Sequence, residues 1–212
     1  MKLVFTGIQG CGKGTQGRLL QEKYGFEIVE MWGELRRVIA SWSELWMKLK
    51  EVMDKWFMVS DELWAEVMRT AIENYKDKDR VIFDGFIRLE WNKELFDSYL
   101  SEYKVVLFDL SEEKAKSRLL GRVYNPATGE TFPSRTTHDP GTGEQLIKRK
   151  DDTESSILQR INEYVTKAVP IVEKQKEEWR VIDINADQPI EDVFAQLEDK
   201  LGLSQEKDYC NV

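Results

Sequence analysis

Glycines recur at short intervals in residues 7–16, GIQGCGKGTQ, with a lysine and a threonine in the same stretch. Glycines let the main chain curl so that successive backbone N–H groups point inward, where they can bind an anion. A following helix adds the positive end of its dipole. Lys13 could then reach the outer phosphates of a nucleotide, and Thr15 could offer a hydroxyl near magnesium. The spacing predicts a phosphate-binding loop of an enzyme that uses a nucleoside triphosphate; the alternative is a glycine-rich turn that binds nothing.

Arginines are grouped where they could converge on such a loop. Phosphoryl transfer needs positive charge around the moving group and the exclusion of water. Asp84 ends the apolar run RVIFD, where it could hold magnesium through water, and Arg88 follows in DGFIR. A segment from Gly121 to Asp152, rich in Gly, Pro, Thr and Asp, is predicted to be either a functional lid or a disordered loop. The arginines around it are Arg118, Arg122, Arg149 and Arg160. Any one of them alone would be read as part of a solvated helix face, but their grouping favours a phosphate site.

Five short apolar runs separated by amphipathic stretches indicate an α/β fold, a doubly wound parallel sheet of five strands flanked by helices. The runs are KLVFT, EIVE, RVIFD, KVVLFDL and RVIDI. The last helix is predicted between Pro189 and Gly202, which serve as start and stop signals. Two insertions break the strand-helix rhythm, a helical one near residues 30–59 and the segment 121–152.

The composition of the 212 residues suits one compact soluble domain, since 41% are hydrophobic and no apolar run approaches the roughly 20 residues of a membrane span. The N-terminus runs directly into a strand without a signal peptide, so a cytoplasmic location is expected. Two cysteines, Cys11 and Cys210, and one histidine, His138, do not suffice for a zinc cluster. A net charge of −8 disfavours nucleic acid as a partner.

Four motifs, in order, resemble those of the adenylate kinases, within the nucleoside monophosphate kinase family. They are GIQGCGKGTQ, DGFIR, the lid ends LLGRVYNPATG and RKDDTESSILQR, and residues 43–62, SELWMKLKEVMDKWFMVSDE. Gln9 and Ile87 stand where the family usually has proline. The resemblance implies a core of residues 1–29, 60–120 and 153–212, an insertion at 30–59 that binds the nucleoside monophosphate (NMP), and a long lid at 121–152.

The resemblance also implies the roles of individual residues. Catalytic groups would be Lys13, Asp84, Arg88, Arg122, Arg149 and Arg160. ATP would be bound by Gly10, Cys11, Gly12, Lys13, Gly14, Thr15, Arg118, Arg122, Thr131, Phe132 and Gln188. AMP would be bound by Met31, Arg36, Phe57, Met58, Val59, Gly85, Arg88, Asn92, Arg149 and Arg160. The implied reaction is the reversible conversion of ATP and AMP into two ADP by a monomer, with Mg²⁺ carried by the nucleotide near Thr15 and Asp84.

Some family members hold the lid with a cysteine-bound zinc ion. Here the matching positions are Asn125, Thr128, Asp139 and Thr142, short polar side chains that can bond one another and the nearby backbone. The sequence therefore predicts a lid without structural zinc, held by hydrogen bonds. The alternative is that these are ordinary turn residues.

The acceptor region departs from the family, which leaves alternatives open. Glu30, Met31 and Trp32 stand where the family has small polar residues, and Asn92 stands where adenylate kinases have Gln and pyrimidine kinases often have Asn. The favoured interpretation is a repacked small subdomain. One alternative is an acceptor such as CMP or UMP, although pyrimidine kinases generally have a short lid, and another is a nucleotide-binding protein without catalysis. Arg36 is favoured over Arg37 as the ligand of the acceptor phosphate.

Overall fold

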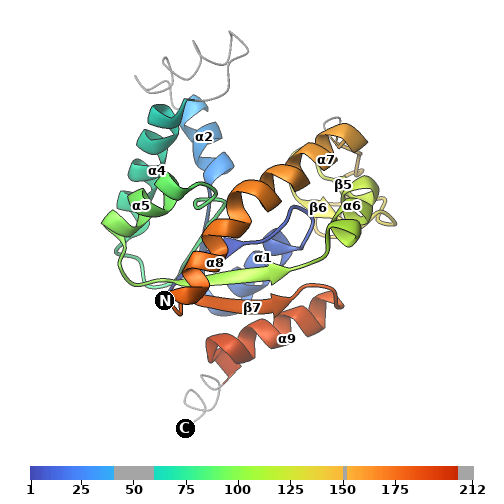
Figure 1. Ribbon diagram of the computed structural model, residues 1–212. Coiled ribbons are helices and arrows are strands. Elements are labelled where there is room, and N and C mark those ends of the chain that lie inside the picture. The colour runs from blue at the N-terminus through green and yellow to red at the C-terminus, as the bar shows by residue number, and fades with distance from the viewer. Residues whose placement is uncertain (41–59, 150–151, 205–212) are drawn as a thin grey trace.

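The computed structural model describes residues 1–40, 60–149 and 152–204. Five parallel strands form one sheet in the order β2-β3-β1-β4-β7 (Figure 1). In that order the strands span Glu27–Glu30, Val81–Asp84, Lys2–Thr6, Lys104–Asp109 and Val181–Asn185. The apolar runs predicted from the sequence are these strands, and the predicted α/β fold is confirmed.

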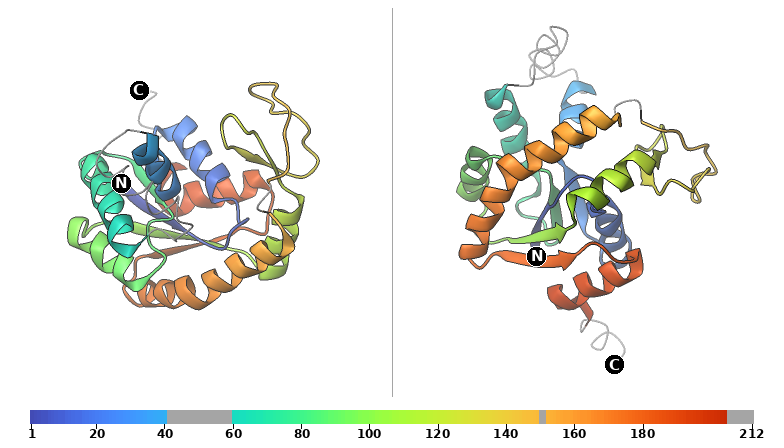
Figure 2. Two further views of the ribbon diagram at one scale, coloured as in Figure 1. Left: turned by 90° about the horizontal axis from the view of Figure 1, so that it is seen from above. Right: turned by 45° about the vertical axis from the view of Figure 1, so that its right-hand side comes forward.

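Helices cover both faces of the sheet (Figure 2). Those described are α1 (Lys13–Tyr24), α2 (Met31–Ala40), α4 (Asp61–Tyr75), α5 (Glu90–Tyr99), α6 (Glu112–Gly121), α7 (Glu154–Glu163), α8 (Val169–Glu177) and α9 (Ile190–Leu201). Leu3 and Phe5 of β1 belong to a core shared with α1, α6, α7 and α9. Val4, between them, belongs to the opposite core, against α2, α4, α5 and α8. Burial on both faces explains why the strands read as unbroken apolar runs.

Short sequence signals fix the ends of several helices. The Ser60 hydroxyl accepts a hydrogen bond from the Leu63 N–H at 3.4 Å and so caps the start of α4. Pro189 precedes α9, and Gly202 ends it in a left-handed conformation with φ of 72°. These are the start and stop residues predicted for the last helix.

One long, bent helical rod is made by α7, a π-helical turn at Tyr164–Ala168 and α8 (Figure 2). Pro170 lies in the first turn of α8 and has no N–H to donate to the carbonyl of residue 166. The wider π turn accommodates this missing bond. The rod carries Arg160 in α7 and continues to Ile171, which is 4% exposed in the core against the sheet.

A small projecting unit lies between α6 and α7 (Figure 1). Its two strands, β5 (Val123–Tyr124) and β6 (Thr131–Phe132), pair antiparallel, with Val123 opposite Phe132. A single bridge further joins Tyr124 to Ile147. The segment that the sequence predicts as a lid is therefore organised around a minimal ladder of strands.

Candidate active site

The glycine-rich loop curls directly after β1. Gly7 has φ of 141°, and a Cβ there would lie 2.6 Å from the carbonyl oxygen of Phe108 and 2.9 Å from Cys11 Sγ, so only glycine fits. The Lys13 ammonium donates to the carbonyls of Gly7 at 2.6 Å and Ile8 at 3.3 Å. The loop is thus already closed around its lysine, as a preformed anion cradle requires.

The first turn of α1 continues the loop. Gly10 and Gly12 have φ of 88° and 98°, and Lys13 is the first residue of the helix. Gly14 is exposed and Thr15 half-buried at the open end of this turn. The unpaired N–H groups of a helix N-terminus and the positive end of its dipole therefore face the loop.

Two carboxylates end neighbouring strands beside the loop. In the sheet register Asp84 of β3 lies opposite Phe5 of β1 and opposite Glu30 of β2. Partial burial and then Asp84 raise the pKa of Glu30, while Arg36, Arg18 and Arg149 lower it. Sequence reasoning found Asp84 but assigned no role to Glu30.

Arg88 owes its place to Gly85. The Arg88 Nε donates to the carbonyl of Gly85 at 3.2 Å, and a Cβ on Gly85 would lie 2.7 Å from an Arg88 terminal nitrogen. Burial lowers the pKa of Arg88, whereas Asp84 and Glu163 raise it. Among the described residues the Gly85 carbonyl is the hydrogen-bond acceptor of this half-buried guanidinium, so its other donors are available to an anion.

Asp152 joins two of the predicted catalytic arginines. Its carboxylate accepts from Arg122 Nε at 2.6 Å, Arg122 NH2 at 2.8 Å and Arg160 NH1 at 3.0 Å. The Asp152 side chain is 5% exposed. Sequence reasoning missed this residue, and its only signal was a position between Arg149 and Arg160 in the segment RKDDTESSILQR.

Arg149 is supported differently. Its Cζ lies 5.3 Å from the ring centroid of Tyr124, a cation–π contact. Of the three predicted catalytic arginines near the projecting unit, Arg122 and Arg160 are thus held by one carboxylate and Arg149 contacts an aromatic ring.

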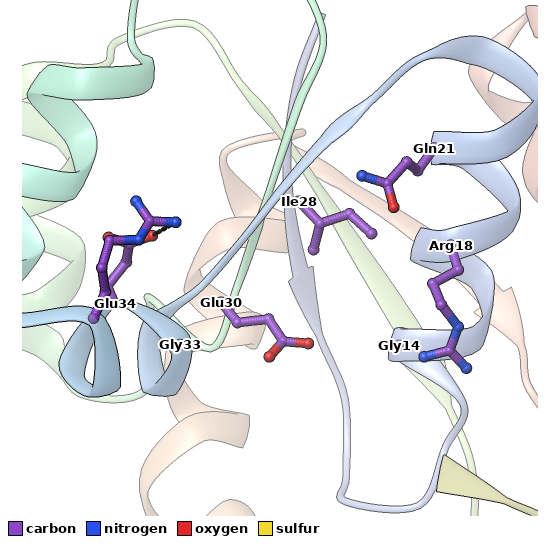
Figure 3. Close-up of a pocket in the computed structure, with 8 residues that line it drawn as sticks. Gly14, Arg18, Gln21, Ile28, Glu30, Gly33 and Glu34 are labelled. Atoms are coloured by element: carbon purple, nitrogen blue, oxygen red, sulfur yellow. Dashed lines mark ion pairs between the residues drawn. The ribbon is translucent and has the colours of Figure 1, made fainter. Parts of the chain in front are cut away.

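A cavity of about 300 Å³ lies between α1 and the start of α2. Figure 3 shows the Glu30 carboxylate and the Arg18 guanidinium reaching toward it from opposite sides. Arg18 also pairs with Glu130 of the projecting unit at 2.9 Å, and Arg37 pairs with Glu34 at 3.2 Å on the far wall. The cavity therefore has ion pairs at its borders, which suits polar ligands.

The comparison with protein families decides what this arrangement is. The model described as "Adenylate kinase" matches residues 5–179. This chain belongs to the adenylate kinase family. The family indicates a phosphotransferase of the nucleoside monophosphate kinase type with nucleotides as substrates. The match includes the end of β1, the glycine-rich loop and every arginine named above.

The two arginines of this chain that are candidates for binding the acceptor phosphate have different surroundings. The Arg36 side chain is 67% exposed, and its ion-pair partner among the described residues is Glu30, at 3.8 Å. Arg37 pairs with Glu34 and donates to the Tyr75 hydroxyl at 3.4 Å. Arg36 is therefore the freer of the two for an incoming phosphate.

The other residues expected to bind AMP are mostly buried or lie outside the described ranges. Met31 is fully buried in the core under α2. Asn92 is 2% exposed, and its amide oxygen caps α5 by accepting from the N–H groups of Arg88 at 3.2 Å and Leu89 at 2.9 Å. Phe57, Met58 and Val59 are the expected contacts that fall outside the described residues.

The residues expected near the ATP base are brought together only in part. Arg118 donates to the carbonyl of Ala186 at 2.9 Å, so α6 and the loop after β7 meet. Gln188 in that loop donates to the Asn185 carbonyl at 3.0 Å. Thr131 and Phe132 are half-buried in β6, on the projecting unit.

The four polar residues predicted to staple the lid meet in one network. Asn125 is fully buried, and its amide donates to Asp139 Oδ2 at 2.7 Å and to Thr142 Oγ1 at 3.2 Å. The Thr128 N–H donates to Asn125 Oδ1 at 3.4 Å. Two turns, each starting at one buried polar residue, are thereby tied together through their side chains.

The described ranges contain neither a metal-binding cluster nor a membrane-spanning helix. No group of three or more His, Cys, Asp or Glu side chains in residues 1–40, 60–149 and 152–204 is arranged to hold a metal ion. Within the same ranges, no helix is long and apolar enough to cross a membrane.

Proposed function

We propose that this protein is an adenylate kinase that transfers the terminal phosphoryl group of MgATP to AMP, reversibly, giving two ADP. The observation that carries the proposal is the adenylate kinase family match over residues 5–179, which contains five cationic side chains in the glycine-rich loop, after β3 and beside the projecting unit. They are Lys13, Arg88, Arg122, Arg149 and Arg160. Gathered around one phosphoryl group, these cations would neutralise the charge that spreads over it in transit.

The chemistry would proceed by positioning and electrostatics, without a covalent intermediate. The loop amides and Lys13 would hold the donor phosphates, and Arg88 with Arg36 would hold the acceptor phosphate. The Thr15 hydroxyl and the Asp84 carboxylate, through water, fit a hard cation that prefers oxygen ligands. The chemistry that Mg²⁺ would supply when bound with ATP is neutralisation of part of the phosphate charge.

Two parts of the chain would enclose the reaction, the NMP-binding insertion at residues 30–59 and the lid at 121–152. Their closure would exclude water and so protect the phosphoryl group from hydrolysis. We further propose that the enzyme is a cytoplasmic monomer. The hydrogen-bonded staple of Asn125, Thr128, Asp139 and Thr142 supports a lid that needs no zinc.

A coupled assay for ADP, run with ATP and a panel of monophosphates, tests the proposal. AMP is expected to be the best acceptor. Lys13→Met and Arg88→Ala are each expected to lower kcat by roughly 10³-fold or more, as loss of a catalytic cation does in related chemistry. Near-normal turnover in either variant, with circular dichroism unchanged, would exclude this mechanism.

A second candidate keeps the chemistry but uses a pyrimidine monophosphate, and Asn92 favours it. The Asn92 amide oxygen is occupied by backbone N–H groups, whereas its buried Nδ2 has no hydrogen-bond partner among the described residues. Such a group can offer only donors to a base, which suits the carbonyl oxygens of uracil or cytosine. A higher kcat/KM for UMP or CMP than for AMP in the same panel would select this candidate.

A further inference from the structure

One of the three lid-side arginines is oriented by an uncharged partner. Arg122 and Arg160 share the carboxylate of Asp152, whereas the Arg149 Cζ lies 5.3 Å from the ring centroid of Tyr124. Within the described part of the chain no carboxylate lies within ion-pair distance of Arg149. The ring is therefore the contact that the structure provides to its guanidinium.

The backbone explains why these two side chains meet. Tyr124 of β5 and Ile147 form a bridge, with the Tyr124 N–H donating to the Ile147 carbonyl at 2.8 Å and the Ile147 N–H to the Tyr124 carbonyl at 3.0 Å. Arg149 follows Ile147 by two residues, so in extended chain its side chain emerges on the same face. A diagonal neighbour across a strand pair is within reach of a long side chain. The contact is thus built into the register.

An aromatic ring holds a guanidinium in a way that a carboxylate does not. It attracts the cation through its π face and accepts none of the five N–H groups in the guanidinium plane. Asp152, in contrast, already occupies Nε and NH2 of Arg122. Arg149 therefore keeps both its full charge and its donors available for phosphate oxygens.

We propose that Tyr124 is a positioning residue. Its ring holds the Arg149 guanidinium in place so that the N–H donors of Arg149 meet the transferring phosphoryl group. The inference rests on the proposed function, because it gives Arg149 that substrate. Tyr124 itself touches no substrate. It acts by removing the need to order a long, flexible side chain when the lid closes.

The test compares two substitutions of Tyr124. Tyr124→Leu keeps an apolar side chain but removes the ring, and is expected to lower kcat roughly tenfold with little change in the KM for either nucleotide. Tyr124→Phe keeps the ring and is expected to stay within about threefold of native kcat. Equal kcat in Tyr124→Leu and the native enzyme would overturn the proposal.

A double-mutant cycle separates positioning from plain packing. In an Arg149→Ala background, Tyr124→Leu is expected to cause no further loss of kcat, because the group that Tyr124 orients is gone. A full tenfold loss in that background would show that Tyr124 acts on the lid fold instead, and would overturn the proposal. Tyr124→Phe alone losing as much as Tyr124→Leu would do the same.

A readout without turnover keeps this inference separable from the proposed function. The Arg149 Cζ lies 5.3 Å from the Tyr124 ring centroid. The NMR signals of the Arg149 Cδ protons are therefore expected upfield in native protein and in Tyr124→Phe, and at ordinary values in Tyr124→Leu. The signals are assigned by their loss in Arg149→Lys. If no monophosphate yields ADP, the proposed function fails while this shift still stands. Unshifted signals in native protein would overturn the role of Tyr124.

Discussion

Arg122 and Asp152 form a bidentate ion pair, with Nε–Oδ2 of 2.6 Å and NH2–Oδ1 of 2.8 Å. The same carboxylate accepts from Arg160 at 3.0 Å. One buried anion thus holds side by side two guanidinium groups that would otherwise repel each other. The pairing joins the end of α6 to α7 across the base of the projecting unit, so both arginines are placed before any nucleotide arrives.

Replacing this anion should disable the site. Asp152→Asn is expected to lower kcat roughly 10²-fold, because two unpaired like charges drift apart and lose their alignment with the phosphoryl group. The matched control is Asp183→Asn, which removes an exposed carboxylate 3.6 Å from Lys176. Steady-state kinetics should show the control within about twofold of native. An Asp152→Asn enzyme that keeps native kcat would contradict this role.

A methyl group on Gly85 should displace Arg88. Gly85 has φ of 75°, and an added Cβ would lie 2.7 Å from the Arg88 guanidinium. Gly85→Ala is therefore expected to raise the KM of the acceptor and to lower kcat, by roughly 10²-fold in kcat/KM.

The control for Gly85→Ala is Gly202→Ala, because Gly202 has φ of 72° with nothing within 4 Å of an added Cβ. Both variants carry the left-handed strain of about 1–2 kcal/mol, and only Gly85→Ala moves an arginine. Thermal melts are expected to shift similarly, while kinetics separate the two variants. A comparable loss of activity in Gly202→Ala would assign the effect to strain alone.

The strands and the curled glycine-rich loop could be predicted from the sequence, because strands buried on both faces leave unbroken apolar runs and a curled loop leaves glycines. The role of Asp152 could not be predicted, because the sequence does not distinguish a solvated carboxylate near arginines from one that is held between them. The contact of Tyr124 with Arg149 depends on a strand register set by a single bridge, and the periodicity of the sequence does not predict that register. Tertiary pairing, rather than local propensity, made these residues functional candidates.

The lid network should stabilise its own segment without metal. Asn125→Ala removes the amide that donates to Asp139 and Thr142 inside the lid. The loss leaves a buried acceptor unpaired and is expected to destabilise the lid by about 1–3 kcal/mol. Limited proteolysis should then cut within residues 121–149 faster than in native protein.

A chelator provides the complementary control for the lid. Native protein that has been treated with EDTA, and from which the EDTA has then been removed, is expected to show the same cleavage rate and the same melting curve as untreated protein. Ala127→Gly, which keeps the backbone N–H bonded to Asn125 Oδ1, should alter proteolysis much less than Asn125→Ala. Zinc bound in stoichiometric amount to purified protein would contradict a hydrogen-bonded staple.

Trp179 is a site where the fold can be stabilised. It is the only non-glycine residue in the described ranges with positive φ, 57°, and its side chain is 92% exposed. Trp179→Gly is expected to raise the free energy of unfolding by about 1 kcal/mol, because glycine adopts this conformation without a Cβ clash. Denaturant titration measures the gain, and kcat should not change. Trp64→Gly, in the partly buried contact with Trp32, should destabilise instead.

Glu30 should make both stability and acceptor binding depend on pH. Partial burial and Asp84 raise the pKa of Glu30 above its ordinary 4.5, so the folded state disfavours the charged carboxylate. The stability linked to Glu30 is present in full below pH 4.5 and is lost as pH rises through the folded-state pKa. Glu30→Gln is therefore expected to raise the melting temperature at pH 7, with the difference shrinking toward pH 4.5.

Glu30→Gln should also lower the acceptor KM severalfold, because a negative charge 3.8 Å from Arg36 is removed. Glu27→Gln, on the same strand but paired with Lys78 at 3.2 Å, is the control and should leave the acceptor KM unchanged. A higher acceptor KM in Glu30→Gln would show that the carboxylate assists binding, opposite to the sign expected here.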